Sequence, residues 1–447
     1  MRAFLHRPFV RRLLISLSVV AVLEVMTGPP GSSSAPTEGI AHSFTQPSPF
    51  FGLFNTLRWV VFLFLALVMF GVWSLWKSQG SAIRSGAHRA MAAPKRLVEP
   101  RPVRQGLLLA LLAFAILLPH IETDAFWQAA MVEQIAVYVL LAMGLNVVVG
   151  FAGLLDLGYV AFYAIGAYTT AWVTGSLPPP APFNIHFDPF WAIPVAIGFA
   201  MLSGVLLGLP TLRLRGDYLA IVTLGFGEII TIFANNLYGI TGGSLGSKPI
   251  PHPVLHIGPI HYTWGLAPVP YYYLTLTFIV IFLVAYYLLE HSRVGRAWTA
   301  IREDEVAAES VGINPLKYKV MAFAIGAATA GFAGVVTASQ SNVIFPVSFT
   351  LFFSINILVL VIFGGMGSMA GVVFGAIVIQ TVGQYLNHVQ PAGYQQQDLY
   401  IYLGALLVLM MIFRPVGLIP SKRRRREIGL AEAGEGHMDE VLTGENP

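Results

Sequence analysis

Long apolar runs dominate the chain and constrain its fold more than any other feature. Seven runs have the length of a membrane-spanning helix, which needs about 20 mostly apolar residues. They cover residues 58–77, 105–120, 129–149, 190–210, 219–238, 271–289 and 318–338. Five shorter or glycine-broken runs cover residues 12–27, 158–175, 353–366, 369–387 and 399–413. The sequence therefore predicts an all-α, polytopic membrane bundle with about 10–12 transmembrane segments, some of them Gly-broken or re-entrant.

The composition argues against a soluble fold. Of the 447 residues, 56% are apolar and 11% are charged, whereas soluble domains carry about 25% charged residues. The net charge of +4 arises from basic residues that lie between the apolar runs and at the ends, which does not favour a nucleic-acid partner. Because the chain has no cysteine, it has no disulfide framework, thiolate metal site or cysteine nucleophile.

The distribution of basic residues predicts the orientation in the membrane. Loops rich in Lys and Arg face the cytoplasm. Four stretches of this kind are Lys77–Arg104, Arg213 with Arg215, Arg293–Lys319 and Lys422–Arg426. Residues 176–189 and 239–270 hold few basic residues and many Pro, Gly, His and Tyr, so we expect them on the outer face. Counting twelve spans then places both termini in the cytoplasm.

Three regions follow from this organisation. Residues 1–95 form an N-terminal extension with up to two extra spans and a Ser/Pro/Gly-rich linker. Its first run follows four arginines and could instead be a signal peptide, although no convincing Ala-x-Ala cleavage site follows it. Residues 96–420 form the main transmembrane domain, and residues 421–447 form a basic, then acidic, cytoplasmic tail that we expect to be disordered.

Two apolar segments are interrupted by glycine clusters in a similar way. They are residues 145–158 and residues 361–371. Unwound backbone inside a membrane is tolerated where protein or a wet cavity satisfies it, so paired breaks point to a transport path. The alternative is close helix packing, which suits Gly204-x-x-x-Gly208 and Gly371-x-x-x-Gly375. The candidate pathway residues in the breaks are Asn146, Gly150, Gly153, Asp156, Gly364, Gly365 and Gly367.

Ionisable residues within apolar runs are further candidates, because a charge in hydrocarbon is costly unless it faces partners or water. Glu228 lies eleven residues after Asp217, about 16 Å into the membrane if Asp217 marks the inner boundary. It is either a pathway carboxylate or a structural group bonded to a neighbouring helix. Asp156 is more simply interpreted as a cap of the broken turn. Glu133 is expected at the membrane–water interface.

The segment 295–315 is the most informative polar stretch. Ala297, Ile301, Val306 and Ala307 could line one face of short amphipathic helices that end at Gly312 and Pro315. A charged loop of this kind can simply be solvated. Its short Ala/Glu-rich helix with a glycine stop nevertheless suits a surface that docks on another protein.

Two further patterns carry no chemistry. Residues 243–249 are only superficially similar to a Gly-x-x-x-x-Gly-Lys-Ser/Thr phosphate loop, and they lie in the predicted outer loop. The histidines at 252, 256 and 261 form no His-Glu-x-x-His pair. We therefore expect no catalytic residue, no metal site and no cofactor site on this chain, which leaves a membrane enzyme as a remote alternative.

Several ordered blocks of the sequence carry a family resemblance. They are residues 144–150 running on to 166–168, 212–228, 295–312, 364–368 and 414–418. These blocks strongly resemble the LivM-type permeases of bacterial ATP-binding-cassette importers for branched-chain amino acids. The resemblance extends from about Lys95 to Pro420, and the first 90 residues match poorly. An extra N-terminal pair of spans is nevertheless similar to longer members of the family.

The resemblance implies a permease subunit of the bacterial plasma (inner) membrane that works with separate partners. These are a second homologous permease (LivH-like), two cytoplasmic ATPases that bind ATP and Mg, and an extracytoplasmic solute-binding protein. It also implies that residues 293–317 form the loop that couples to an ATPase. The coupling residues are then Gly295, Arg296, Ala297, Arg302, Glu303, Asp304, Ala307, Ala308 and Gly312.

Two other transport functions stay open at this stage. Permeases for urea or short amides look similar, and nothing in the sequence separates their cargo from leucine, isoleucine or valine. An ion-driven secondary transporter would also have broken helices and a buried carboxylate such as Glu228. Such a transporter needs no ATPase-docking loop.

Overall fold

The computed structural model describes residues 101–121, 124–178, 187–211, 217–257 and 260–389, with residues 404, 405, 408, 410 and 417–419. The chain divides into two units, Met1–Ala115 and Ile116–Pro447. The predicted spans at 12–27 and 58–77, the N-terminal linker, the tail 421–447 and most of the run at 399–413 lie outside the described residues. So do Arg213 and Arg215.

The described elements follow the apolar runs closely. They are α6 Arg101–Ile121, α7 Ala125–Ala130, the π-helix η1 Met131–Ala136, α8 Val137–Asn146, the π-helix η2 Val147–Phe151, α9 Val160–Val173, α10 Pro189–Thr211, α11 Asp217–Asn236, α12 Tyr238–Thr241, the 3₁₀ helix η4 Gly243–Leu245, β1 Val254–Ile257, β2 Ile260–Thr263, α13 Pro268–Glu290, α14 Arg293–Glu303, α15 Glu305–Ser310, α16 Pro315–Ser341, the 3₁₀ helix η5 Pro346–Ser348, α17 Leu351–Gly364 and α18 Met369–Val389.

Seven of the described helical segments are long and apolar enough to cross a membrane. They are Ala125–Phe151, Pro189–Leu209, Tyr218–Asn236, Pro268–Glu290, Pro315–Ser341, Pro346–Gly364 and Met369–His388, while Ala110–Ile121 and Val160–Val173 are shorter apolar helices. The prediction of a polytopic helical membrane bundle is confirmed. A small antiparallel hairpin, β1 and β2, pairs Val254 with Thr263 within the stretch assigned to the outer face. The sequence analysis did not predict these two strands.

The core forms around two helices of 27 residues, Ala125–Phe151 and Pro315–Ser341, which are much more buried than the other spans. Every residue of α8 is buried. Small residues on α16 allow neighbours to approach closely, because they put backbone rather than side chain at the contact. Gly204 of α10 is one partner: a Cβ there would lie 2.8 Å from the Phe323 carbonyl oxygen, whereas at Gly208 it would make ordinary contact with Val320 at 3.5 Å. The packing interpretation of Gly204-x-x-x-Gly208 is thus confirmed at Gly204, whereas Gly208 has room for a Cβ.

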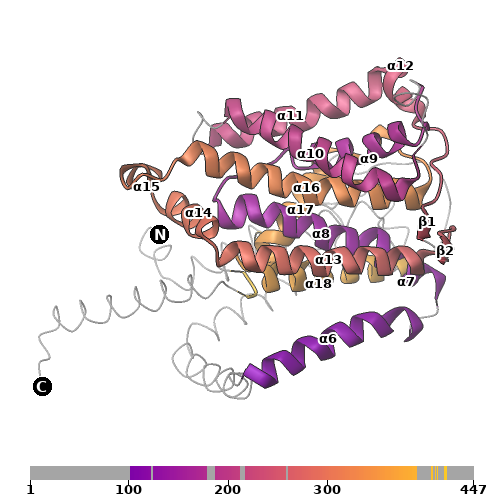
Figure 1. Ribbon diagram of the computed structural model, residues 1–447, viewed down its shortest axis with the longest axis horizontal. Helices are drawn as coiled ribbons and strands as arrows, with labels where there is room; N and C mark the ends of the chain where they lie inside the picture. The colour runs from indigo at the N-terminus through magenta and orange to yellow at the C-terminus, as the bar shows by residue number, and fades with distance from the viewer. Residues whose placement is uncertain are drawn as a thin grey trace, which may run out of the picture. The chain divides into compact units, whose positions relative to one another are not determined.

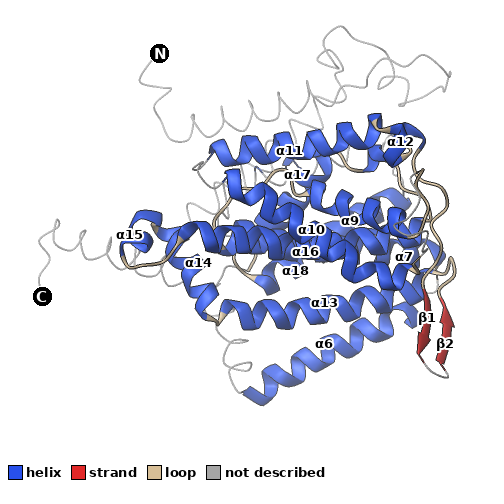
Figure 2. Ribbon diagram, turned by 45° about the horizontal axis from the view of Figure 1, so that its top comes forward, coloured by secondary structure: helices blue, strands red, loops and turns tan. Residues whose placement is uncertain are grey.

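The two kinds of connecting loop lie at opposite ends of the unit Ile116–Pro447. The helices α14 and α15 project at one end of the long helices, and α12 with the β1–β2 hairpin lies at the other, in both views (Figures 1 and 2). This is the separation that the basic loop 293–319 and the Pro/Gly-rich stretch 239–270 need if they face opposite sides of a membrane.

Candidate functional site: two broken spans and a coupling loop

The first break follows directly on η2. The chain is irregular from residue 152 to 159, with Gly153 at φ +71°, and helix α9 begins at Val160. Buried Asp156 accepts the Gly158 N–H through Oδ1 at 2.9 Å, so it caps the turn as the sequence indicated. Two neighbouring helices satisfy other freed donors: the Leu157 N–H donates to Thr223 Oγ1 at 3.0 Å, and the Val160 N–H donates to Ser354 Oγ at 3.0 Å.

The second break separates α17 from α18 by four residues. Gly365 at φ +115° and Gly367 at φ +81° adopt left-handed conformations that disfavour any side chain. A later segment covers this turn, since the Leu418 and Ile419 N–H groups donate to the carbonyls of Phe363 and Gly364 at 2.9 and 3.1 Å. Buried Gly364 also lets α18 approach closely, because a Cβ at Gly364 would clash with the Gly371 carbonyl oxygen.

The structure brings the two breaks together. The Asn146 side chain, fully buried on α8, accepts the Gly367 N–H through Oδ1 at 2.8 Å and donates through Nδ2 to Met369 Sδ at 3.4 Å. A Cβ at Gly150 would lie 2.5 Å from the Gly367 nitrogen. Segments separated by more than 200 residues in sequence therefore form one polar junction, and Asn146 joins them.

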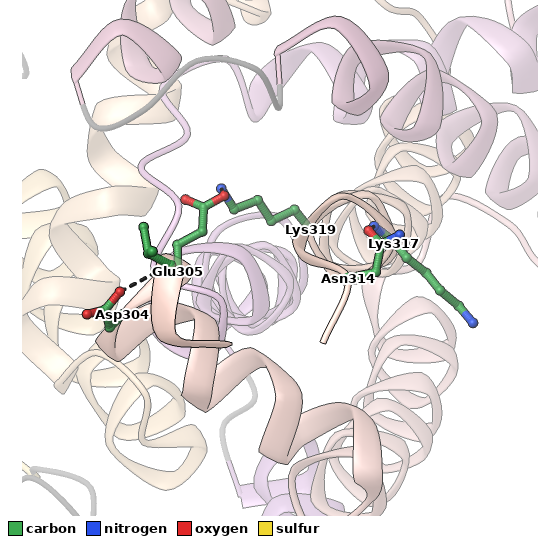
Figure 3. Close-up of polar contacts among 6 residues, drawn as sticks. Asp304, Glu305, Asn314, Lys317 and Lys319 are labelled. Atoms are coloured by element: carbon green, nitrogen blue, oxygen red, sulfur yellow. Dashed lines mark hydrogen bonds and ion pairs between the residues drawn. The ribbon is translucent and has the colours of Figure 1, made fainter. Parts of the chain in front are cut away.

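The loop 293–317 forms a helix, a turn, a short helix and a second turn, each fixed by a capping side chain. Ser292 Oγ accepts from Val294 N at 3.1 Å to begin α14. Asp304 ends α14 and begins α15, accepting from the Val306 and Ala307 N–H groups at 2.9 and 3.0 Å. Asn314 begins α16 by accepting from Lys317 N at 3.2 Å (Figure 3). Gly312, at φ +84°, allows the left-handed turn that ends α15.

The four residues predicted to line one face of this loop do not share a face. Ala297 and Ile301 are buried, together with Gly295, Trp298 and Ala308. Val306 and Ala307 are exposed, so the prediction of one common face is wrong. Asp304 interrupts the helix with extended backbone at φ −154°, ψ 111°, and the helical periodicity of α14 therefore does not continue into α15.

The outward face of the loop combines apolar and charged side chains. Val306 is 58% exposed and Val311 is 75% exposed, with Leu316 at 45%. Of the predicted coupling residues, six are exposed and three are buried in the chain's own core. The exposed set is Arg296, Arg302, Glu303, Asp304, Ala307 and Gly312, and the buried set is Gly295, Ala297 and Ala308.

A buried ion pair that sequence reasoning missed attaches α15 to α16. Lys319 Nζ lies 2.6 Å from Glu305 Oε1, with side chains 5% and 26% exposed (Figure 3). Trp298 on α14 adds a second attachment by donating its Nε1–H to the Tyr318 carbonyl at 2.7 Å. The spacing of fourteen residues between the charges crosses a turn whose path the sequence does not define. These contacts hold the loop as a rigid extension of the long helix α16.

Arg302 connects the loop to the breaks. Its Nη1 donates to the carbonyl of Gly150, the buried glycine of η2. Its aliphatic stem crosses Gly153, where a Cβ would lie 2.7 Å from Arg302 Cγ, and a Cβ at Gly367 would lie 3.1 Å from Nη1. Three glycines from the two predicted breaks thus surround one arginine from the predicted coupling loop.

Glu228 lies beside the first break rather than within the junction. It follows Gly227, where a Cβ would lie 3.2 Å from the Gly158 Cα, and it is half-buried on the unbroken helix α11. Unlike Glu133, which accepts from Gln340 Nε2 at 3.2 Å, Glu228 forms no hydrogen bond or ion pair within the described part of the chain. One turn earlier, Gly225 borders open space.

The other motifs weighed in the sequence have structural partners. Residues 243–249 form η4 and a loop that pairs with the chain near Ile344, through Ser247 N and Oγ. His252 Nδ1 lies 2.9 Å from the Tyr271 hydroxyl. Within the described residues, no group of three or more His, Asp or Glu side chains could hold a metal ion.

The apolar helices and the paired broken spans define a polytopic α-helical membrane protein. The chain belongs to the family described as "Branched-chain amino acid transport system / permease component", whose model matches residues 129–413. Membership of this transport family confirms the resemblance inferred from the sequence blocks.

Individual relatives cover most of the chain. It is 39% identical over 358 residues to the high-affinity branched-chain amino acid transport system permease protein LivM of Escherichia coli (strain K12), covering 75% of this chain and 80% of that protein. The corresponding LivM of Salmonella typhimurium is 37% identical over 356 residues, with the same coverage. The permease protein LivH of Salmonella typhimurium is 26% identical over 298 residues, covering 63% of this chain and 91% of that protein. No solved structure matches the chain.

The ion pair between Lys319 and Glu305 leads to a stability prediction. Lys319→Met should lower the free energy of unfolding by about 2 kcal/mol, less than a fully buried pair loses, because Glu305 remains partly exposed. Lys317→Met makes the same chemical change at an exposed position two residues earlier and should change stability little. Thermal unfolding of the purified variants in detergent measures both, and equal effects would contradict the assignment.

Proposed function

We propose that this chain is one permease subunit of an ATP-driven importer in the bacterial plasma (inner) membrane. It translocates the branched-chain amino acids leucine, isoleucine and valine after an extracytoplasmic solute-binding protein delivers them. A second, homologous permease completes the pathway, and two cytoplasmic ATPases bind ATP and Mg and supply the energy. The chain itself is a transport subunit and not an enzyme.

The observation that carries this proposal is the geometry of the α14–α15 loop. It projects at the end of the unit Ile116–Pro447 opposite the hairpin (Figure 1). It bears Arg293 and Arg296, with Lys317 at the start of α16, and its Val306 and Val311 side chains are exposed. The basic residues favour a cytoplasmic location for this end. An apolar surface framed by charges suits a protein partner there, whereas a gradient-driven transporter has no need of one.

The names of the relatives support the proposed cargo and the proposed second permease. Both LivM proteins and LivH are described as permeases of high-affinity branched-chain amino acid transport systems. Because the chain aligns with LivM and, more weakly, with LivH, a pair of homologous subunits is the simplest assembly. Selection of the cargo then lies largely with the binding protein.

The mechanism we infer is alternating access. ATP closes the two ATPases together, which displaces the docked loop α14–α15 and the helix α16 to which Lys319 and Trp298 attach it. The movement swings the membrane helices so that the pathway opens alternately to the two sides. Backbone at the two breaks can reorient because its hydrogen bonds go to side chains such as Asn146 and Asp156, and not to a continuous helix.

The candidate pathway consists of the two breaks and of Glu228 on α11. The glycines 150, 153, 364, 365 and 367 keep the breaks free of side chains, and Asn146 and Asp156 hold their turns. Glu228 supplies a carboxylate about 16 Å from the start of α11, beside the open space at Gly225. A mid-membrane carboxylate without a partner in the described part of its own chain suits a wet pathway between two permeases.

Reconstituted uptake tests the proposed function directly. Proteoliposomes that contain this chain with its permease, ATPase and binding-protein partners should take up leucine when ATP is supplied to the ATPases. Uptake should persist when the proton and sodium gradients are collapsed and should stop without the ATPases. Uptake driven by a gradient alone would establish a secondary transporter, and uptake of urea or acetamide in place of leucine would change the assigned cargo.

The exposed valines of the loop provide a test of docking. The double variant Val306→Asp/Val311→Asp puts two charges in the proposed contact and should reduce co-purification of the ATPases at least about tenfold, since charge in an apolar interface is costly to desolvate. Val347→Asp changes a valine that is 76% exposed in η5, which packs against η4, so it controls for charge and exposure. Unchanged co-purification of the double variant would contradict the docking surface.

Glu228→Gln tests the pathway carboxylate. Uptake should fall about tenfold or more at normal expression and assembly, because the neutral amide no longer supplies a negative charge to the path. Glu228→Asp should retain part of the activity, and Glu290→Gln, at the exposed end of α13, should behave as wild type. Loss of the assembled complex instead of uptake would identify Glu228 as a structural group.

A further inference from the structure

The helix that enters the first break ends without intrahelical partners for its last carbonyls. This is true of the end of any helix, and inside a membrane each such carbonyl needs another donor. Two are satisfied locally, since Val147 O accepts from Ala152 N at 3.1 Å and Val148 O accepts from Leu154 N at 3.0 Å. The carbonyl of buried Gly150 accepts from the guanidinium of Arg302, so a residue 152 positions away completes this helix end.

The charge of Arg302 suits this position. A helix carries partial negative charge at its carboxyl end, which favours a cation there. A hydrogen bond from a charged donor is also about twice as strong as a neutral one. Arg302 belongs to the last turn of α14, and α14 is held to α16 by Trp298. The long helix 125–151 is thus capped by a separate, rigid element.

The same side chain lies against both breaks. The absence of a Cβ at Gly153 lets the arginine stem cross the first break, and Gly367 of the second break lies beside Nη1 and the Gly150 carbonyl. The Gly367 N–H is held by Asn146, one turn before Gly150 on the first helix. The rings of Phe151 and Trp298 stack beside this contact with centroids 6.5 Å apart. A displacement of α14 would therefore move the backbone of both breaks.

We infer that Arg302 is the positioning residue that transmits movement of the coupling loop to the two broken spans. It acts through the Gly150 carbonyl and the Gly367 turn, and not through contact with an ATPase. This inference rests on the proposed function for its transport readout. Its structural part is that Arg302 stabilises the backbone of both breaks. This part does not depend on the cargo or on the energy source.

The structural part is tested by hydrogen exchange on the purified full-length complex in nanodiscs. Arg302→Met should raise the exchange rate of amides in residues 147–158 and in residues 365–371 together, about tenfold, because a buried carbonyl loses its charged donor. Arg302→Lys keeps a cation and should restore part of the protection. Arg296→Met, at an exposed arginine six residues earlier on α14, should leave both segments as in wild type. Unchanged protection in Arg302→Met would overturn the inference.

The functional part is tested on the same complexes after reconstitution. Arg302→Met should keep the ATP hydrolysis that loaded binding protein stimulates, while leucine uptake per ATP falls at least about fivefold. Loss of ATPase co-purification in Arg302→Met would show a docking role and overturn the inference, as would parallel loss of hydrolysis and uptake. If wild type takes up no leucine, the proposed function fails, and hydrogen exchange still decides the role of Arg302.

Discussion

A break in a membrane helix exposes backbone N–H and C=O groups that lipid cannot satisfy, and this requirement governs the arrangement of the described part of the chain. Each break is completed by atoms from elsewhere in the sequence. Asn146 accepts a hydrogen bond from the Gly367 N–H in the second break. Thr223 and Ser354 accept hydrogen bonds from N–H groups of the first break. The N–H groups of residues 418 and 419 donate to carbonyls at the second break. The breaks are therefore built into the packing of α8, α11, α17 and α18 and are not local defects of single helices.

The same requirement separates the charged groups of the spans into two kinds. Lys319 and Asp156 are buried, and each has a partner within the chain, as buried charges need if the protein is to remain folded. Glu228 has none within the described residues, although it lies well inside α11. A group that folding does not explain is better explained by water, by cargo or by a facing subunit. This contrast supports placing the pathway along α11.

Much of the fold could be predicted from the sequence because it depends on local physics. Apolar runs of spanning length correspond to α10, α11, α13 and α16 to within three residues at each end, and Gly365 and Gly367 marked a turn that only residues without Cβ adopt readily. The orientation of α15 could not be predicted. The extended backbone at Asp304 interrupts the helical periodicity, so Val306 is exposed and does not share a face with buried Ile301 as the sequence pattern predicted.

The sequence predicted the residues of the two breaks and those of the loop 293–317 as separate sets. It did not predict that the two sets meet in space. Nothing in the local pattern of residues 145–158 indicates that Asn146 reaches Gly367, or that Gly150 accepts from Arg302, because tertiary packing selects contacts across 221 and 152 residues. Glycine clusters and a charged amphipathic loop are each common in membrane proteins. Their meeting at Arg302 is informative, because a guanidinium that caps a helix end is directional and tolerates little displacement. Such a contact can respond to a shift of the loop where purely apolar packing, which is non-directional, would accommodate it.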